Sequence, residues 1–258
     1  MADREQRPVM KPLVRDQARR MRSFEKRVFQ RVSVATAVSE RDALAIREMG
    51  CRDVTVVPNG VDLEFFTPAA DATPEPRSLI FTGSMDWRPN QDAIAWFAAE
   101  VHPLLLETGD YRLYVVGRNP PSWMTEPGGL PGQIIVTGRV DDVRGWVDRA
   151  LVYVVPLRVG GGSRLKILEA LAMKKATVST TVGAEGLDIS DGRDIVLRDE
   201  PRAFVDAVTS LWADAARRTA LGVAGRAMVE SKYGWKGIAR IQKEVWQTAI
   251  ARRSAAGG

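Results

Sequence analysis

The chain reads VYVVPLRVGGGSRLKILEA over residues 152–170, where an apolar run gives way to glycines and then to a helical pattern. The apolar run Val152–Val155 is typical of a buried strand, and the spacing of apolar residues after Ser163 predicts a helix that begins there. Glycines at 160–162 let the backbone turn tightly between the two elements. The stretch therefore predicts one strand–loop–helix unit of an α/β fold.

The alternation of strand and helix patterns continues on both sides of this stretch. Because parallel strands need crossover helices that cover the sheet, we expect an α/β fold with a doubly wound parallel sheet. The expected strands are Leu79–Thr82, Leu113–Val116, Ile134–Thr137, Val152–Val155, Thr177–Ser179 and Ile195–Leu197. The expected helices lie near residues 91–107, 142–149, 163–173, 201–213 and 215–252, the last with a break at Gly234.

The N-terminal part carries most of the net charge of the 258-residue chain. Residues 1–31 hold ten Lys or Arg against four Asp or Glu, whereas the whole chain has a net charge of only +5. A basic arm describes this better than general nucleic-acid binding. Residues 13–31 predict an amphipathic helix, which either covers the protein's own core or contacts an anionic membrane surface or a partner. Its apolar stripe consists of Val14, Ala18, Met21, Phe24 and Val28.

A shorter strand–helix–strand pattern follows the arm. Residues 34–38 predict a strand, Ser39 with Asp42 predicts the N-cap of a helix over 40–49, and residues 54–57 predict a second strand. This strand is closed by the turn-forming Pro58-Asn59-Gly60.

Scarce residue types exclude several classes of site. Cys51 is the only cysteine and His102 the only histidine, so an internal disulfide and multi-cysteine or multi-histidine metal sites are excluded. His102 is expected on the surface of its helix. No apolar stretch approaches the roughly 18–20 residues of a membrane span, and the N-terminus is charged where a signal peptide is apolar. We therefore expect a cytoplasmic protein.

The start of the helix near Ser163 is a candidate anion site. Exposed N–H groups at a helix start and the positive end of the helix dipole attract phosphate, and Arg164 and Lys166 add full charges. Glu169, within two turns, is placed to accept hydrogen bonds from a ribose diol. The alternative is a flexible loop followed by a solvated charged helix. The glycine spacing fits neither a Walker A loop nor a GxGxxG fingerprint.

Three other strand ends carry glycine, at Gly83, Gly117 and Gly138. In open α/β sheets ligands bind beyond the carboxyl ends of the strands, and glycine lets the backbone approach a ligand closely. Each glycine alone could instead serve only to tighten a turn.

Four motifs stand out along the chain: Asn59–Asp62, Gly83–Trp87 with Pro89-Asn90, Gly161–Ala170 and Gly183–Leu187. Together they resemble a known family, the C-terminal half of retaining GT-B-fold glycosyltransferases of the glycosyl transferases group 1 type. The resemblance spans roughly residues 30–250. It implies a Rossmann-like sugar-nucleotide-binding domain at 53–233, a remnant of the acceptor-side domain at 1–52, and a crossing helix and tail at 234–258.

The resemblance also implies roles for single residues. Glu169 would hold the donor ribose, the backbone at Gly83-Ser84 and at Gly161–Arg164 would cradle diphosphate and sugar, residues 137–140 would flank the base, and Arg118 would reach toward the donor. The expected substrate-binding residues are Gly83, Ser84, Arg88, Arg118, Gly138, Gly161, Gly162, Ser163 and Glu169.

The sequence departs from the family's pattern at charged positions. The first of two carboxylates that the family often carries falls on Gly161, and an Arg and a Lys of the first glycine loop fall on Ser84 and Pro89. Arg88, Arg164 and Lys166 could supply the missing positive charge. We expect Arg164 and Lys166 to stabilise the departing diphosphate, which makes them the catalytic candidates.

The resemblance implies transfer of a sugar, with retention, from a nucleoside diphosphate such as UDP to a glycan, a lipid-linked sugar or a small molecule. It implies neither a metal nor a cofactor, and it suggests bacterial polysaccharide synthesis in the cytoplasm or at the inner face of the membrane. One alternative is a non-catalytic nucleotide-sugar-binding module that needs a separate acceptor subunit or a second copy. Another is an unrelated α/β scaffold whose glycines are structural.

Overall fold

The computed structural model describes residues 11–160 and 164–256, which belong to two compact units. The larger unit runs from Asn59 to Ile238, and the smaller unit combines the chain up to Pro58 with the chain from Ala239. The units therefore divide a few residues after the boundaries that we expected, at 52/53 and 233/234.

The larger unit is built on six parallel strands in the order β5-β4-β3-β6-β7-β8. Each strand overlaps one of the expected apolar runs, which confirms the doubly wound α/β fold. The strands are β3 (Ser78–Thr82), β4 (Arg112–Val116), β5 (Ile134–Gly138), β6 (Val152–Val155), β7 (Ala176–Ser179) and β8 (Val196–Leu197).

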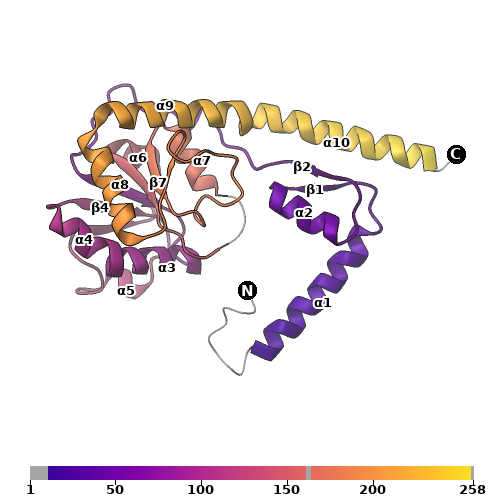
Figure 1. Ribbon diagram of the computed structural model, residues 1–258, viewed down its shortest axis with the longest axis horizontal. Coiled ribbons are helices and arrows are strands. Elements are labelled where there is room, and N and C mark those ends of the chain that lie inside the picture. The colour runs from indigo at the N-terminus through magenta and orange to yellow at the C-terminus, as the bar shows by residue number, and fades with distance from the viewer. Residues whose placement is uncertain (1–10, 161–163, 257–258) are drawn as a thin grey trace. The chain divides into compact units, whose positions relative to one another are not determined.

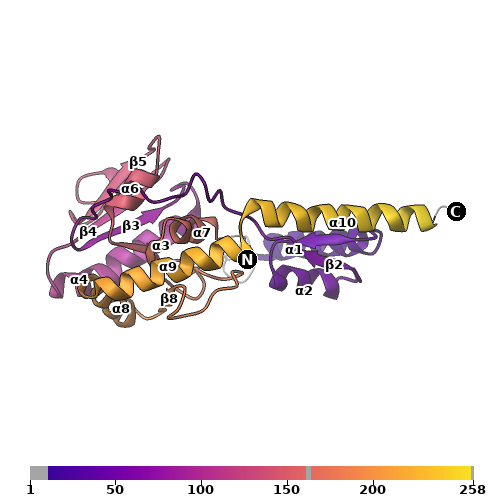
Figure 2. The same cartoon turned by 90° about the horizontal axis from the view of Figure 1, so that it is seen from above.

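Helices cover both faces of this sheet (Figures 1 and 2). The segment after β3 packs with α8, and α7 packs with α9. The helices are α3 (Arg88–Trp96), a π-helical turn (Phe97–Val101), α4 (His102–Glu107), α5 (Ser122–Thr125), α6 (Arg144–Arg149), α7 (Leu165–Ala172), α8 (Pro201–Ala213) and α9 (Ala215–Lys232).

The π-helical turn interrupts the long helix expected over 91–107, and α4 resumes at His102. The expectation of a surface position for His102 is wrong. The side chain is buried, and its Nδ1 lies 2.7 Å from the Tyr111 hydroxyl, so the ring is satisfied inside the core. Burial lowers the pKa of His102, which favours the neutral ring.

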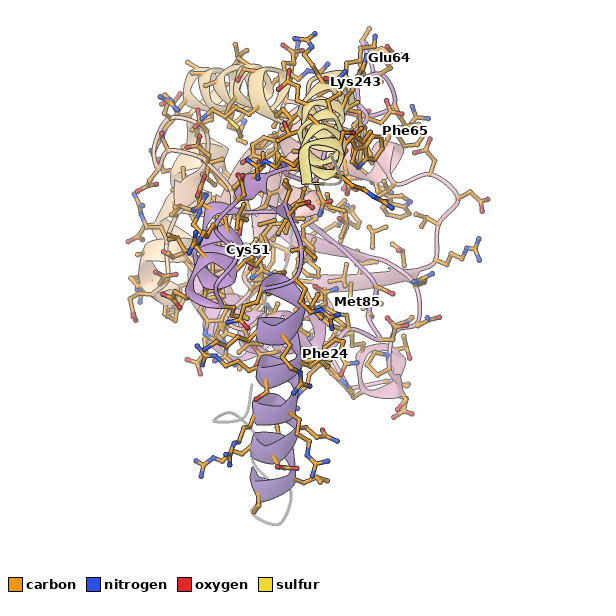
Figure 3. All side chains as sticks on the ribbon, turned by 90° about the vertical axis from the view of Figure 1, so that its right-hand side faces the viewer. Phe24, Cys51, Glu64, Phe65, Met85 and Lys243 are labelled. Carbon is orange, nitrogen blue, oxygen red and sulfur yellow. The ribbon has the colours of Figure 1, made fainter. Side chains whose placement is uncertain are left out.

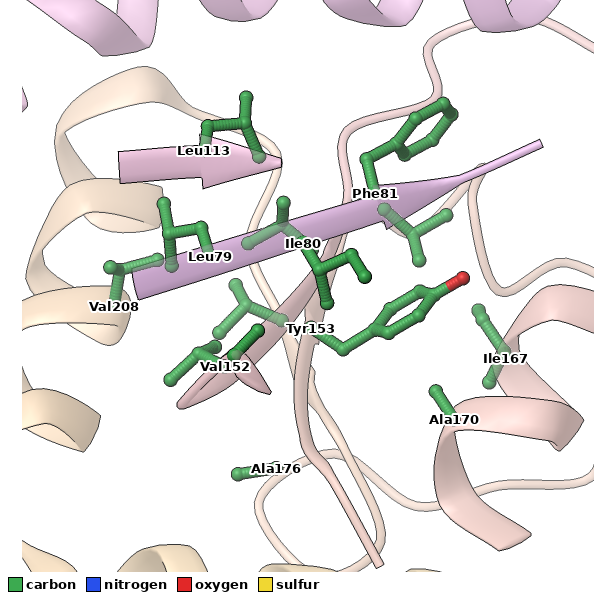
Figure 4. Packing of buried hydrophobic residues seen from close by; sticks show 14 of the residues in the cluster. Leu79, Ile80, Phe81, Leu113, Val152, Tyr153, Ile167, Ala170, Ala176 and Val208 are labelled. Atoms are coloured by element: carbon green, nitrogen blue, oxygen red, sulfur yellow. The ribbon is translucent and has the colours of Figure 1, made fainter. Parts of the chain in front are cut away.

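The central strand β3 is buried along its whole length. Figure 4 shows Phe81 at its carboxyl end, with Tyr153 of β6 facing Ile167 and Ala170 on α7. These side chains fix α7 against the two central strands, because a close-packed interior leaves a helix little freedom to shift.

The strand order reverses between β3 and β6. The chain moves outward from β3 to β4 and β5 on one side, and from β6 to β7 and β8 on the other. The loops after β3 and β6 therefore lead away in opposite directions, and such a switch point is where open α/β sheets bind ligands.

The smaller unit contains α1 (Lys11–Phe29), β1 (Ala35–Ala37), α2 (Glu40–Glu48), β2 (Val54–Val56) and most of α10 (Trp235–Ala256). β1 and β2 form a parallel pair, and Ser39 caps α2 by accepting a hydrogen bond from the Asp42 N–H. Arg252 of α10 donates to the Ser33 carbonyl at 3.0 Å. Cys51 is buried in the small core of this unit (Figure 3).

Apolar side chains of this unit remain exposed. Met21 and Phe24 on α1 are 58% and 55% exposed, and Trp246 and Ile250 on α10 are 62% and 66% exposed (Phe24 is marked in Figure 3). The stripe on α1 is therefore not covered by the described residues of this unit. Within residues 11–160 and 164–256, no helix combines the length and apolar character of a bilayer-crossing segment.

Candidate functional site

The loops that follow β3, β4 and β5 are joined at the carboxyl edge of the sheet. The Gly83 N–H donates to the Val116 carbonyl at 3.0 Å, and the Gly117 N–H donates to the Gly138 carbonyl at 3.1 Å. The loop after β3 is fastened again where the Met85 N–H donates to the Arg118 carbonyl at 2.8 Å. Three of the predicted glycines therefore lie at one edge.

Glycine stands at these positions for different structural reasons. A Cβ on Gly117 would lie 1.7 Å from the Gly83 carbonyl oxygen, so Gly117 is needed for the close packing of two loops. Gly117 therefore has a structural role in loop packing, which differs from the tightening of a turn. Gly138 has a left-handed backbone, with φ +70°, and a Cβ there would meet no described atom within 4 Å.

Lys166, in the first turn of α7, reaches across to the loop after β3. Its Nζ donates to Asn90 Oδ1 at 2.8 Å and lies 4.0 Å from the centroid of the Phe81 ring. A Cβ on Gly83 would lie 2.8 Å from the same Nζ. The ammonium therefore occupies the space beside Gly83, at the carboxyl end of β3.

The ammonium of Lys166 sits where water is scarce. Its pKa is lowered to about 7, chiefly by desolvation and also by the neighbouring charge of Arg164, while Glu169 opposes both effects. Burial likewise raises the pKa of Glu169, while Lys166 opposes the shift. A poorly hydrated cation is strongly attracted to an anionic ligand that brings its own charge into the same space.

Glu169 lies one turn after Lys166 on α7 and is half-buried. Its carboxylate accepts no hydrogen bond from the residues that the structure describes, so its acceptor capacity is available to a ligand.

Arg164 is 5% exposed, at the N-cap of α7. Its Nη2 donates to the Val182 carbonyl at 2.9 Å, and its guanidinium lies beside Gly160. Its Nε has no partner among the described residues. Burial lowers the pKa of Arg164, and Glu185 opposes that shift. The side chain therefore fastens the start of α7 to the loop after β7.

A polar network joins the ends of β3 and β4. Arg118 Nε donates to Ser84 Oγ at 2.9 Å, and Ser84 Oγ donates to Asp86 Oδ1 at 2.6 Å. Asn119 Nδ2 donates to the other Asp86 oxygen at 2.9 Å. The hydrogen bond from Ser84 is the largest cause that lowers the pKa of Asp86. The structure thus brings two predicted site residues, Ser84 and Arg118, into direct contact.

The four remaining expected residues fall into two groups. Arg88 is exposed at the first position of α3. Gly161, Gly162 and Ser163 lie outside the described residues, so their expected contacts with the diphosphate stay predictions.

Sequence reasoning missed Asn90 as a site residue. This side chain is 5% exposed, accepts from Lys166 and donates from Nδ2 to the Ser84 carbonyl at 2.8 Å. A polar residue directly after a proline at a helix start was the available signal, but no periodicity pointed to a contact with residue 166.

Comparison with curated proteins finds longer enzymes. A D-inositol 3-phosphate glycosyltransferase from Paenarthrobacter aurescens is 27% identical over 260 residues, covering 92% of this chain and 62% of that protein. A lipopolysaccharide core biosynthesis mannosyltransferase, LpcC, from Rhizobium leguminosarum is 28% identical over 223 residues, covering 79% of this chain and 61% of that protein. The chain thus spans less than two thirds of these relatives.

Solved structures show the same fold. Sucrose-phosphate synthase from Thermosynechococcus elongatus matches with a TM-score of 0.71 at 19% identity, over 90% of this chain and 62% of that one. Anabaena Alr3699/HepE in complex with UDP and glucose matches with a TM-score of 0.64 at 13% identity, over 84% of this chain and 62% of that one.

The family comparison agrees with the motifs and with the fold. The model of a family described as glycosyl transferases group 1 matches residues 76–214, from just before β3 to the end of α8. This match covers more than half of the 258 residues. The chain belongs to the glycosyl transferases group 1 family.

Proposed function

We propose that the larger unit binds the donor of a glycosyltransferase, which moves a sugar from a nucleoside diphosphate to an acceptor with retention of configuration. One observation carries the proposal. At the switch point of the sheet, the Lys166 ammonium lies beside Gly83. The Glu169 carboxylate, which accepts no hydrogen bond from a described residue, lies one turn further along α7.

Each part of a nucleotide sugar has a matching group in this arrangement. The diphosphate lies against Lys166 and the start of α7, where the helix dipole adds positive potential. The ribose hydroxyls donate to Glu169, and the open backbone at Gly138 flanks the base. As the sugar departs, negative charge grows on the diphosphate, and a fixed cation stabilises that charge. Arg164 supports this stabilisation by holding the start of α7 in place beside Gly160.

The relatives support a sugar donor and leave the acceptor open. Those reported above are named as a D-inositol 3-phosphate glycosyltransferase and a lipopolysaccharide core mannosyltransferase, and the Anabaena structure holds UDP and glucose. The acceptor is therefore a glycan, a lipid-linked sugar or a small polyol, in keeping with bacterial polysaccharide or glycolipid synthesis near the membrane. The reaction as proposed needs no metal or cofactor.

The test is calorimetric titration with UDP- and GDP-sugars, combined with mass analysis of released sugar. The wild type is expected to bind one donor, and Glu169→Ala to bind it at least about tenfold more weakly, because hydrogen bonds to a carboxylate are lost. Glu100→Ala, on the exposed surface of the π-helical turn, is the matched control and should bind as the wild type does.

The outcomes separate the candidate functions. Binding with slow release of sugar supports the enzyme. Binding without turnover, restored by an added acceptor-side protein, selects the non-catalytic module. Failure of the wild type to bind any sugar nucleotide would end the proposal.

Donor affinity is expected to depend on pH through Lys166. Its pKa lies at about 7, so the ammonium loses its proton as the pH rises above that value. The diphosphate of UDP-glucose stays ionised throughout, and its affinity should therefore fall at least about tenfold between pH 6 and pH 9. Calorimetry over this range measures the change. Lys166→Met should show weak binding with a flat profile, and a flat profile in the wild type would contradict the assignment.

The same shift predicts the sign of a stability change in the ligand-free protein. The folded pKa of Lys166 is lower than its ordinary value of 10.5, so between about pH 7 and 10.5 the unfolded chain binds more protons than the folded chain. This group therefore makes the free energy of unfolding rise with pH in that window. Urea titration of the wild type against Lys166→Met isolates the contribution.

A further inference from the structure

We infer that Asn90 is a positioning residue, which holds the Lys166 ammonium at the loop after β3 and so sets how strongly that ammonium grips the donor diphosphate. The inference deepens the proposed function and rests on it. Asn90 itself touches Lys166 and the loop, and it acts on the ligand only through Lys166.

The contacts of Asn90 form a bridge between α7 and the first glycine loop. Its Oδ1 accepts from Lys166 Nζ at 2.8 Å, and its Nδ2 donates to the Ser84 carbonyl at 2.8 Å. The two bonds use both ends of one amide. The ammonium of Lys166 and the carbonyl of Ser84 are therefore held at fixed positions relative to each other.

The chemistry of the two partners explains why an amide stands here. An ammonium only donates hydrogen bonds and a carbonyl oxygen only accepts them. A side chain between them must accept on one side and donate on the other. An ionised carboxylate cannot donate to the Ser84 carbonyl, and an apolar side chain can serve neither partner. Asparagine satisfies both while 5% exposed.

Asn90 is itself firmly held. It lies in the first turn of α3, its N–H donates to the Trp87 carbonyl at 2.9 Å, and Pro89 fixes the backbone before it. A lysine side chain loses much rotamer freedom when it is immobilised. A rigid acceptor that orients Lys166 before the donor arrives removes part of that entropic cost from binding.

Among the described residues, the charges that shift the pKa of Lys166 come from α7 and its N-cap. Arg164 at the N-cap lowers its pKa and Glu169 raises it. From β3 it meets the ring of Phe81, and from α3 the amide of Asn90. A new charge at position 90 would therefore face Lys166 directly.

A mutant cycle tests the inference, with UDP and GDP as calorimetric probes. Asn90→Ala is expected to weaken binding about tenfold, and to have no further effect in a Lys166→Met background. Gln91→Ala is the matched control, since Gln91 donates from Nε2 to the Met85 carbonyl at 2.7 Å. It removes an equivalent tether between α3 and the same loop, and it should change affinity less than about twofold.

A second variant tests for a change in the pKa of Lys166, which would not occur if Asn90 only supported the loop after β3. Asn90→Asp keeps the shape of the side chain and places a carboxylate against the ammonium, so the pKa of Lys166 should rise. NMR titration of ¹³C-labelled lysine side chains in the intact chain, with the Lys166 signal assigned from Lys166→Met, measures this without a ligand.

The outcomes are distinguishable. Non-additive losses in the cycle and a raised pKa in Asn90→Asp support the inference. Equal losses for Asn90→Ala and Gln91→Ala in both backgrounds, or an unmoved Lys166 titration in Asn90→Asp, overturn it while the proposed function stands. Failure of the wild type to bind either nucleotide refutes the proposed function instead, and the NMR titration still decides whether Asn90 holds the ammonium.

Discussion

Lys166→Met is expected to slow donor hydrolysis by about 100- to 1000-fold, the loss typical when one fixed donor to a developing negative charge is removed. The substitution keeps much of the side-chain length and leaves a neutral group beside Gly83. It removes the ammonium that lies between the carboxyl end of β3 and the start of α7. Release of sugar from UDP- or GDP-sugars, followed by mass spectrometry, measures the effect.

The control for this prediction is Lys236→Met. Lys236 belongs to the same unit, but its side chain is 96% exposed and pairs with Glu64 at 3.4 Å on the surface. Surface ion pairs contribute little to stability, so this variant should hydrolyse the donor like the wild type. Equal hydrolysis rates for Lys166→Met and the wild type would show that Lys166 takes no part in the reaction.

Gly117→Ala is expected to lower the free energy of unfolding by about 3 kcal/mol or more and to abolish donor binding. The new Cβ would lie 1.7 Å from the Gly83 carbonyl oxygen, which belongs to the backbone and cannot rotate away. Overpacking of this kind forces the backbone to shift. The shift would move Gly83 and the space in which Lys166 sits. Urea unfolding measures the stability, and calorimetry measures the binding.

Gly145→Ala is the matched control, because Gly145 lies in α6 and a Cβ there would meet no described atom within 4 Å. Alanine in a helix is favoured over glycine by up to about 1 kcal/mol, so this variant should be as stable as the wild type or more so. A Gly117→Ala protein of wild-type stability would show that the loops after β3 and β4 do not pack as described.

The sheet was predictable because its strands β3, β4, β6 and β7 are almost wholly buried. Such strands read as continuous apolar runs, and all six were found within a few residues of their ends. The interruption of the helix after β3 was not predictable from the sequence, because a π-helical turn at Phe97–Val101 leaves the apolar pattern almost unchanged. The burial of His102 depends on Tyr111, a partner from another element, and helical spacing carries no information about such a partner.

The candidate site was predicted in part. Sequence reasoning found Lys166 and Glu169 on one helix, since charge and helical spacing are visible in a sequence. It did not find Asn90, whose role depends on a contact between residues 76 positions apart. Nor could it separate Gly117, which is needed for loop packing, from Gly83, which borders the ammonium. The expected roles of Gly161, Gly162 and Ser163 stay predictions.

For the smaller unit, the individual helices and strands could be predicted, but their packing could not. The amphipathic pattern of α1 was visible, but a pattern does not say what its apolar stripe packs against. In the structure Met21 and Phe24 are exposed, as are Trp246 and Ile250 on α10. The three alternatives for the stripe on α1, which are a core of the protein itself, a membrane surface and a partner protein, all stay predictions.

A crystal structure of the chain with a bound UDP- or GDP-sugar tests the central claim most directly. We expect the diphosphate within hydrogen-bond distance of Lys166 Nζ at the start of α7, and the ribose hydroxyls on the Glu169 carboxylate. A nucleotide bound elsewhere, or one whose diphosphate leaves Lys166 paired only with Asn90, would contradict the account.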